Sequence, residues 1–121
     1  MADSSALRIH RRQVPGGLSI VSVGGEIDLA TAHLLHDSLS PHLSDPATTV
    51  LVCDLTQVEF LACSGLSILV DAHTTLAARG ARLSVVAVAP AVLRPMTVTG
   101  LLGTLTVYPT LATALAQSTE D

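Results

Sequence analysis

Hydrophobic and polar residues alternate along this chain with two different periods. The period is two over residues 7–14 and again over residues 18–23, which is typical of half-buried strands. The turn sequence Pro-Gly-Gly at 15–17 separates the two segments and predicts that they form a β-hairpin. Over residues 31–43 the leucines recur at helical spacing, so a first helix is expected there.

The rest of the chain alternates between short apolar runs and helical patterns. A second helix is expected where apolar residues share one face and Gly80 ends the pattern, and a third where Pro90 stands at a helix start. After the hairpin, the predicted strands are 50–53, 83–88 and 105–108, and the predicted helices are 31–43, 64–79, 90–100 and 110–117.

These elements follow one another in the order β-β-α-β-α-β-α-β-α. Strands that alternate with helices pair in parallel through crossover connections, whereas the leading hairpin adds an antiparallel pair. The expected fold is therefore a single α/β domain over residues 1–121, with a mixed but mostly parallel sheet of about five strands and about four helices. Residues 1–6 and 117–121 are expected to form flexible tails.

Composition narrows the classes of function. Apolar residues make up 49% of the chain and charged residues 13%, a balance that favours a folded core over disorder. The formal charge is −4, and six scattered arginines without any lysine do not form the basic patch that nucleic acids or anionic membranes attract. Because Phe60 and Tyr108 are the only aromatic residues, stacking on nucleic-acid bases is also excluded.

The sequence also predicts a cellular location. It opens without the basic and apolar pattern of a signal peptide, and no apolar stretch reaches the length of about 18 residues that a membrane helix requires. We therefore expect a cytoplasmic protein, in which the two cysteines, Cys53 and Cys63, are reduced thiols.

Two loops of the predicted sheet are candidates for the functional site, because function gathers beyond the carboxyl ends of parallel strands. They are the stretches 24–31 and 55–66. Ser64 is expected to be the N-cap of the helix after the second loop, and Gly65 would let a partner approach the backbone. A phosphate on Ser64 would meet the unpaired N–H groups and partial positive charge of that helix N-terminus. The alternative is that Ser64 serves only as a helix cap.

Two motifs in these loops carry a family resemblance. Residues 25–31 read Gly-Glu-Ile-Asp-Leu-Ala-Thr, and residues 60–66 read Phe-Leu-Ala-Cys-Ser-Gly-Leu after the apolar stretch 50–55. In this order and spacing, together with 98–101 and 107–116, they resemble the anti-sigma factor antagonists of the STAS domain family over nearly the whole chain. The resemblance implies a non-enzymatic bacterial regulator that binds and releases protein partners and needs no cofactor.

The resemblance also assigns roles to residues. Ser64 matches a serine that is phosphorylated by the partner, an anti-sigma factor with a histidine-kinase-like ATPase fold. The unphosphorylated form binds this partner and frees a sigma factor, and phosphorylation ends the contact, which requires a Ser64 hydroxyl that the kinase can reach. Asp28 matches an acidic position beside the phosphorylation loop; the alternative is an N-cap carboxylate favoured by the helix dipole. The expected partner-binding residues are Glu26, Asp28, Thr31, Ala62, Cys63, Ser64 and Gly65, on a monomer or weak dimer.

The second loop departs from the family pattern at two positions. Ala62 stands where many relatives have Asp, which implies weaker docking to the usual kinase or a different partner, and Cys63 stands where they have Ser. A thiol near a helix N-terminus can have a lowered pKa, so Cys63 also allows a redox-gated regulator, through a disulfide with Cys53 or with a second molecule. The ordinary alternative is that both cysteines pack as small thiols.

The remaining alternatives belong to other classes. One is a STAS subunit of a larger complex, such as a stressosome or a lipid-transport assembly. Another is a thiol-dependent enzyme that uses Cys63, but the sequence fixes no base near it, so no catalytic residue is expected. His33 and His36 are spaced to share a helix face, but no third ligand follows at a suitable spacing, so no metal site is expected.

Overall fold

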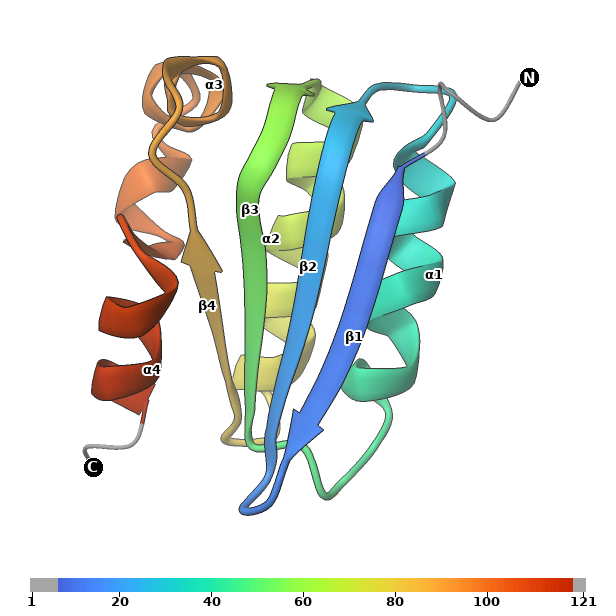
Figure 1. The fold of residues 1–121 in the computed structure, drawn as a ribbon, viewed down its shortest axis with the longest axis vertical. Helices are drawn as coiled ribbons and strands as arrows, with labels where there is room; N and C mark the ends of the chain where they lie inside the picture. The colour runs from blue at the N-terminus through green and yellow to red at the C-terminus, as the bar shows by residue number, and fades with distance from the viewer. Residues whose placement is uncertain (1–6, 119–121) are drawn as a thin grey trace.

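The strands form one five-stranded sheet in the order of the sequence, with helices on both of its faces (Figure 1). The computed structural model describes residues 7–118. Strand β1 is antiparallel to β2, and all later neighbours are parallel. In chain order the elements are β1 (Arg8–Val14), β2 (Leu18–Ile27), α1 (Ala32–Leu43), β3 (Val50–Leu61), α2 (Cys63–Ala77), β4 (Arg82–Val86), α3 (Pro90–Val98), the 3-10 helix η2 (Leu101–Gly103), β5 (Thr106–Tyr108) and α4 (Leu111–Ser118).

This arrangement confirms the predicted fold class and the predicted order of strands and α-helices, to which η2 is an addition. Because β2 to β5 are parallel, they all end at one edge of the sheet, which lies at the top of Figure 1. We call this the carboxyl edge. The turn of the β1–β2 hairpin lies at the opposite edge, which we call the hairpin edge.

Alternating side chains of the central strands supply two separate cores. Val21 and Cys53 face α1 and α2, whereas Ile20 and Val52 face α4. The successive residues of a strand point to opposite faces, so the continuous apolar runs of β2 and β3 are buried on both sides of the sheet. The larger core contains the helix leucines that the sequence pattern placed on one face, Leu35, Leu39, Leu66, Leu69 and Leu76.

Strands β2 and β3 are longer than the sequence pattern predicted. The prediction ended them at residues 23 and 53 and treated 55–66 as a loop, whereas they run to Ile27 and Leu61. The pairing slips by one residue twice, because Ser22 lies opposite Asp54 but Gly24 lies opposite Gln57, and a second slip follows Gly25. Each slip inserts an extra residue into β3 and breaks the apolar alternation, which is why the sequence resembled a loop.

The ends of the other elements differ from the prediction by a few residues. Strand β4 ends at Val86 and α2 at Ala77, both before the predicted ends at 88 and 79. Helix α4 ends at Ser118, one residue beyond the predicted helix end at 117 and inside the segment 117–121 that was expected to be a tail. The rest of the two expected tails, 1–6 and 119–121, lies outside the described residues. Over the described range 7–118, no helix combines the length and apolarity required to cross a bilayer.

Arg79, which follows α2, ties the end of α2 to the end of α1. Its guanidinium donates hydrogen bonds to the backbone carbonyl of His42 at 3.1 Å, of Leu43 at 3.3 Å and of Thr48 at 2.9 Å. The last carbonyls of a helix have no hydrogen-bond donor within the helix, so a cationic side chain that donates to them stabilises the helix end.

We predict that Arg79→Ala lowers the free energy of unfolding by about 1.5 kcal/mol, because three carbonyls lose a charged donor. Urea denaturation of the two proteins measures the change. Arg94→Ala is the control, since Arg94 is exposed on α3. A loss for Arg79→Ala no larger than for Arg94→Ala would contradict a role for the three bonds.

His42 is buried in the last turn of α1, and its Nε2 has no hydrogen-bond partner among the described residues. Burial lowers the pKa of His42 below its usual value of 6.5, and the nearby Arg11 lowers it further, while Asp45 acts in the opposite direction. The folded protein therefore holds this imidazole in its neutral form at a pH where the unfolded chain already binds a proton.

We predict that the folded state loses stability as the pH falls below about 6.5, since protonation then favours the unfolded chain. Above that pH the contribution of His42 is fully present. Urea midpoints from about pH 7 to about pH 5 should decline more steeply for the wild type than for His42→Leu, which has no proton to bind. Parallel declines in the two proteins would rule out His42 as the source.

Candidate functional site

Asp28 and Thr31 close the turn between β2 and α1 with reciprocal hydrogen bonds. Asp28 Oδ1 accepts the N–H groups of Ala30 and Thr31, both at 3.0 Å, and Thr31 Oγ1 accepts the N–H of Asp28 at 3.0 Å. The Thr31 hydroxyl also donates to the carbonyl of Glu26 at 2.8 Å. These bonds form an Asx turn before α1, whose N-cap is Thr31, so the alternative of Asp28 as the N-cap carboxylate is wrong by three positions.

The junction of β3 and α2 is sharper than the sequence predicted. Helix α2 begins at Cys63, and its N-cap is Ala62, whose extended backbone has φ −85° and ψ 168°. The prediction of Ser64 as the N-cap is therefore wrong by two positions, because β3 continues to Leu61 and the helix starts immediately after it. Since alanine has no side-chain acceptor, no side chain caps the first amides of α2.

Ser64 lies in the first turn of α2 and is half-buried. Its Oγ atom is buried and has no hydrogen-bond partner among the described residues. In this rotamer the hydroxyl is not open to a kinase, so the expectation of a reachable hydroxyl is not met. An unpaired buried hydroxyl lowers the stability of the folded protein by about 1–3 kcal/mol. A serine side chain has three staggered rotamers, so the hydroxyl has other positions open to it.

Gly65 is buried, and the reason for a glycine here differs from the predicted one. A Cβ atom at this position would lie 2.6 Å from Ile27 Cγ2 and 2.7 Å from Leu61 Cδ1. The missing side chain lets the start of α2 pack against the ends of β2 and β3. Gly65 therefore serves internal packing, and it does not present its backbone to a partner as we expected.

The two motif segments lie side by side at the carboxyl edge. The N–H of Ala62 donates to the carbonyl of Ile27 at 2.8 Å, and Ile27 lies opposite Leu61 in the sheet. Two large apolar side chains are exposed beside this contact, Leu29 with 85% of its surface exposed and Phe60 with 48%. We give the name junction surface to the exposed and half-buried residues of the two motif segments at this edge, namely Glu26, Asp28, Leu29, Phe60, Cys63 and Ser64.

Comparison with known proteins identifies the fold and its motifs. A family model described as STAS domain matches residues 11–114. The chain is also 38% identical over 99 residues to the anti-sigma-F factor antagonist RsfB of Mycobacterium tuberculosis, which covers 82% of this chain and 80% of that relative. The chain belongs to the anti-sigma factor antagonists of the STAS family.

Solved structures agree with this assignment. This STAS domain is similar to an anti-sigma factor antagonist from Mycobacterium paratuberculosis, with a TM-score of 0.84 and 39% identity over 92% of each chain. It shares the fold of the anti-sigma factor antagonist SpoIIAA in its unphosphorylated form, with a TM-score of 0.78 and 17% identity over 92% of this chain and 96% of that one. The family resemblance carried by the two motifs is therefore confirmed.

The two cysteines of this STAS domain have different environments. Cys53 is fully buried in β3, where burial and the neighbouring Asp54 raise the pKa of its thiol to about 12. Cys63 is exposed at the first residue of α2. In the sheet, Cys53 lies opposite Val21, and Leu61, two residues before Cys63, lies opposite Ile27. Val21 and Ile27 are six strand steps apart, or roughly 20 Å. A disulfide requires 4.4–6.8 Å between the two Cα atoms. Of the two disulfides that the redox alternative allowed, the one between Cys53 and Cys63 is therefore ruled out in this fold.

Two residues of the junction surface were missed as binding candidates, Leu29 and Phe60. Both lie inside the quoted motifs, and a large apolar side chain in a polar turn or next to an acidic residue was the available signal. The histidine pair stands apart from this site on α1, where His36 Nδ1 lies 3.5 Å from Asp37 Oδ1 and both side chains are exposed. No group of three or more metal-ligating side chains occurs within residues 7–118.

Proposed function

We propose that this STAS domain is an anti-sigma factor antagonist that binds an anti-sigma factor through the junction surface and thereby frees a sigma factor. The relative RsfB carries this role in its name and is 38% identical to the chain. The observation that supports the location is the contact between Ala62 and Ile27, which holds both family motifs together beside Ser64. In this proposal the protein acts in the cytoplasm as a monomer or weak dimer, and it performs no catalysis itself.

The junction surface has the chemistry of a protein interface. Leu29 and Phe60 offer exposed apolar area, and burial of apolar area is the main favourable contribution to most protein–protein association. Glu26 is exposed and Asp28 half-buried at its border, where charged groups select the partner more than they add affinity.

In the proposed switch, the partner is a kinase with a histidine-kinase-like ATPase fold that transfers the terminal phosphoryl group of ATP to Ser64 Oγ. The hydroxyl proton is lost to solvent and ADP leaves, so that a group of about −1.5 to −2 charge is formed. Phosphorylation requires the Ser64 side chain to rotate out of its buried rotamer. Once outside, the phosphate lies at the N-terminus of α2, where amides and the helix dipole stabilise an anion.

Incubation of the purified protein with its anti-sigma factor and ATP, followed by phosphopeptide mass spectrometry, tests the switch. We expect phosphate on Ser64 in the wild type and none in Ser64→Ala. Ser67→Ala is the matched control, because Ser67 is an exposed hydroxyl on the same helix and its loss should leave labelling unchanged. A complex that forms but carries no phosphate would support binding and refute the switch, as would be seen for a permanent subunit of a larger assembly.

The exposure of Cys63 next to Ser64 favours one alternative, a redox gate. Attack of the Cys63 thiolate on oxidised glutathione would form a mixed disulfide and release one glutathione thiol, which places a bulky anionic group on the junction surface. Binding of the anti-sigma factor should then fall after oxidation and return with dithiothreitol. Cys63→Ser should bind equally well in both states; if it were as sensitive to oxidation as the wild type, Cys63 would not be the gate.

A further inference from the structure

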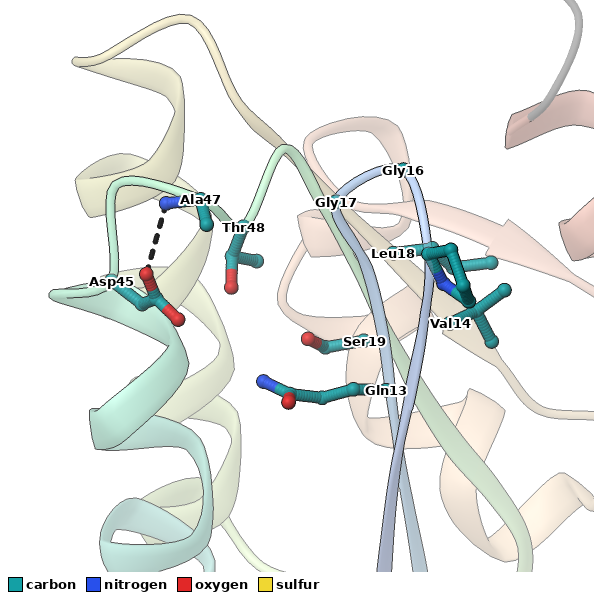
Figure 2. Close-up of a pocket in the computed structure, with 10 residues that line it drawn as sticks. Gln13, Val14, Gly16, Gly17, Leu18, Ser19, Asp45, Ala47 and Thr48 are labelled. Atoms are coloured by element: carbon teal, nitrogen blue, oxygen red, sulfur yellow. Dashed lines mark hydrogen bonds between the residues drawn. The ribbon is translucent and has the colours of Figure 1, made fainter.

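A pocket at the hairpin edge lies far from the junction surface. It has a volume of about 390 Å³ and is formed between the β1–β2 turn and the loop that connects α1 to β3. Figure 2 shows the side chains of Gln13, Ser19, Asp45 and Thr48 pointing into this space. Gln13 comes from β1 and Ser19 from β2, whereas Asp45 and Thr48 come from the connecting loop, so three segments converge on one point.

The polar groups of this pocket are only partly used by the protein. Asp45 Oδ1 accepts the N–H of Ala47 at 2.9 Å, and within residues 7–118 no hydrogen bond reaches Oδ2. Ser19 and Thr48 each have only 2% of their surface exposed, but their hydroxyl oxygens are not among the buried unpaired side-chain atoms of residues 7–118, which are His42 Nε2 and Ser64 Oγ. The small exposed part of each residue therefore includes its hydroxyl oxygen. These hydroxyl oxygens and the free carboxylate oxygen can therefore accept hydrogen bonds from a molecule in the pocket.

The charge of the pocket indicates the charge of the molecule that it would bind. Asp45 is the only charged residue among those that line the space. The loop also follows the C-terminal end of α1, which carries the negative end of the helix dipole. Arg79 bonds to the carbonyls of Leu43, at the end of α1, and of Thr48, in the loop, but it does not line the pocket. A cation is therefore favoured over an anion.

We propose that the hairpin-edge pocket binds a primary ammonium group. Such a group is compact and has three N–H donors, which suit Asp45 Oδ2 and the hydroxyl oxygens of Ser19 and Thr48. A guanidinium is planar and prefers the flat fork of a carboxylate, whereas these acceptors come from different sides of the space. The chain contains no lysine side chain that could supply this group, so its source in this proposal is another molecule, either a free amine or a lysine of a protein partner.

This proposal is independent of the switch at Ser64. Ser19 and the end of β2 are eight strand steps apart, or roughly 25 Å, so the pocket and the junction surface cannot share a small ligand. A variant at one end can therefore be tested without touching the other.

Titration of the protein with n-butylamine at constant ionic strength, followed by NMR of the backbone amides, tests the site. We expect saturable shifts centred on Ala47 and Thr48, with a dissociation constant on the order of 1 mM or tighter. n-Butanol has the same shape without the charge and should produce no such shifts. The absence of saturable shifts with butylamine would overturn the proposal.

Matched variants identify the group that carries the binding. Asp45→Asn removes the charge but keeps an oxygen that can accept the Ala47 N–H, so the loop stays folded while the affinity should fall at least about tenfold. Asp37→Asn makes the same change of charge at an exposed position of α1 and should leave the affinity unchanged. If both variants bound equally well, the shifts would reflect general charge and the proposed site would be wrong.

Two peptides then distinguish the sources of the ammonium group. A short peptide with one lysine is compared with the same peptide carrying norleucine. Tighter binding of the lysine peptide than of butylamine, lost with norleucine, assigns the pocket to a partner protein. If butylamine binds more tightly than the lysine peptide, the pocket is assigned to free amines. Equal binding of the lysine and norleucine peptides would contradict recognition of an ammonium group.

Discussion

Ser64→Glu is expected to weaken the binding of the anti-sigma factor by about 100-fold or more, a loss of several kcal/mol that is typical of a like or unpaired charge in an interface. The glutamate side chain cannot occupy the buried position of the Ser64 hydroxyl, so its carboxylate is expected on the junction surface, which already carries Glu26 and Asp28. A docking partner would then have to bury this charge next to Leu29 and Phe60. Isothermal titration calorimetry with the purified anti-sigma factor measures the change.

Two variants control for this result. Ser64→Ala should bind as well as the wild type and gain up to about 1 kcal/mol of stability, since it removes a buried hydroxyl that has no partner. Thr75→Glu places the same charge at an exposed position near the other end of α2 and should bind normally. Wild-type affinity in Ser64→Glu would exclude the switch, and an equal loss in Thr75→Glu would show that overall charge, and not the site, decides.

Gly65→Val is expected to lower the free energy of unfolding by about 3 kcal/mol and to weaken partner binding as well. The new side chain would overlap Ile27 and Leu61, which already lie within 2.7 Å of the position of a Cβ atom. Relief requires the start of α2 to move away from β2 and β3, which displaces Ser64 and Cys63 together. Urea denaturation measures the first effect and calorimetry with the partner the second.

A double-mutant cycle connects the loss to the proposed contact. In a Leu61→Ala background the space that Leu61 Cδ1 fills is vacated, so the additional cost of Gly65→Val should be smaller than in the wild type. Gly103→Ala is the control for glycine replacement in general, because nothing lies within 4 Å of a Cβ atom there. Additive effects of Leu61→Ala and Gly65→Val would contradict packing as the reason for Gly65.

The fold was predictable because alternating strand and helix patterns leave few topologies. The hairpin signal at residues 15–17 and the helical leucines of α1 and α2 sufficed for the order of elements and the mixed sheet. The full length of β3 was not predictable, since two bulges add residues that interrupt the period of two, and only the pairing with β2 shows that the strand continues.

The sequence predicted which residues belong to the candidate site better than it predicted how they are arranged. The motifs located Asp28 and Ser64, but cap positions depend on where a strand stops, and β3 stops at Leu61, one residue before the N-cap. The role of Gly65 depends on Ile27, which is 38 positions away in the chain and reaches it only through the sheet. The apolar part of the junction surface depends on which side chains stay uncovered, which no local pattern contains.

The hidden rotamer of Ser64 has a consequence for how selective such a switch is. The buried rotamer reduces the fraction of molecules that display an acceptor oxygen at any moment, because only an outward rotamer can receive a phosphoryl group. Enzymes that meet the protein only by chance encounter few competent molecules. A kinase that first docks on Leu29 and Phe60 can stabilise the outward rotamer of Ser64 and so raise the fraction of molecules that it can phosphorylate. The conformation of Ser64 in the substrate would then contribute to the choice of kinase.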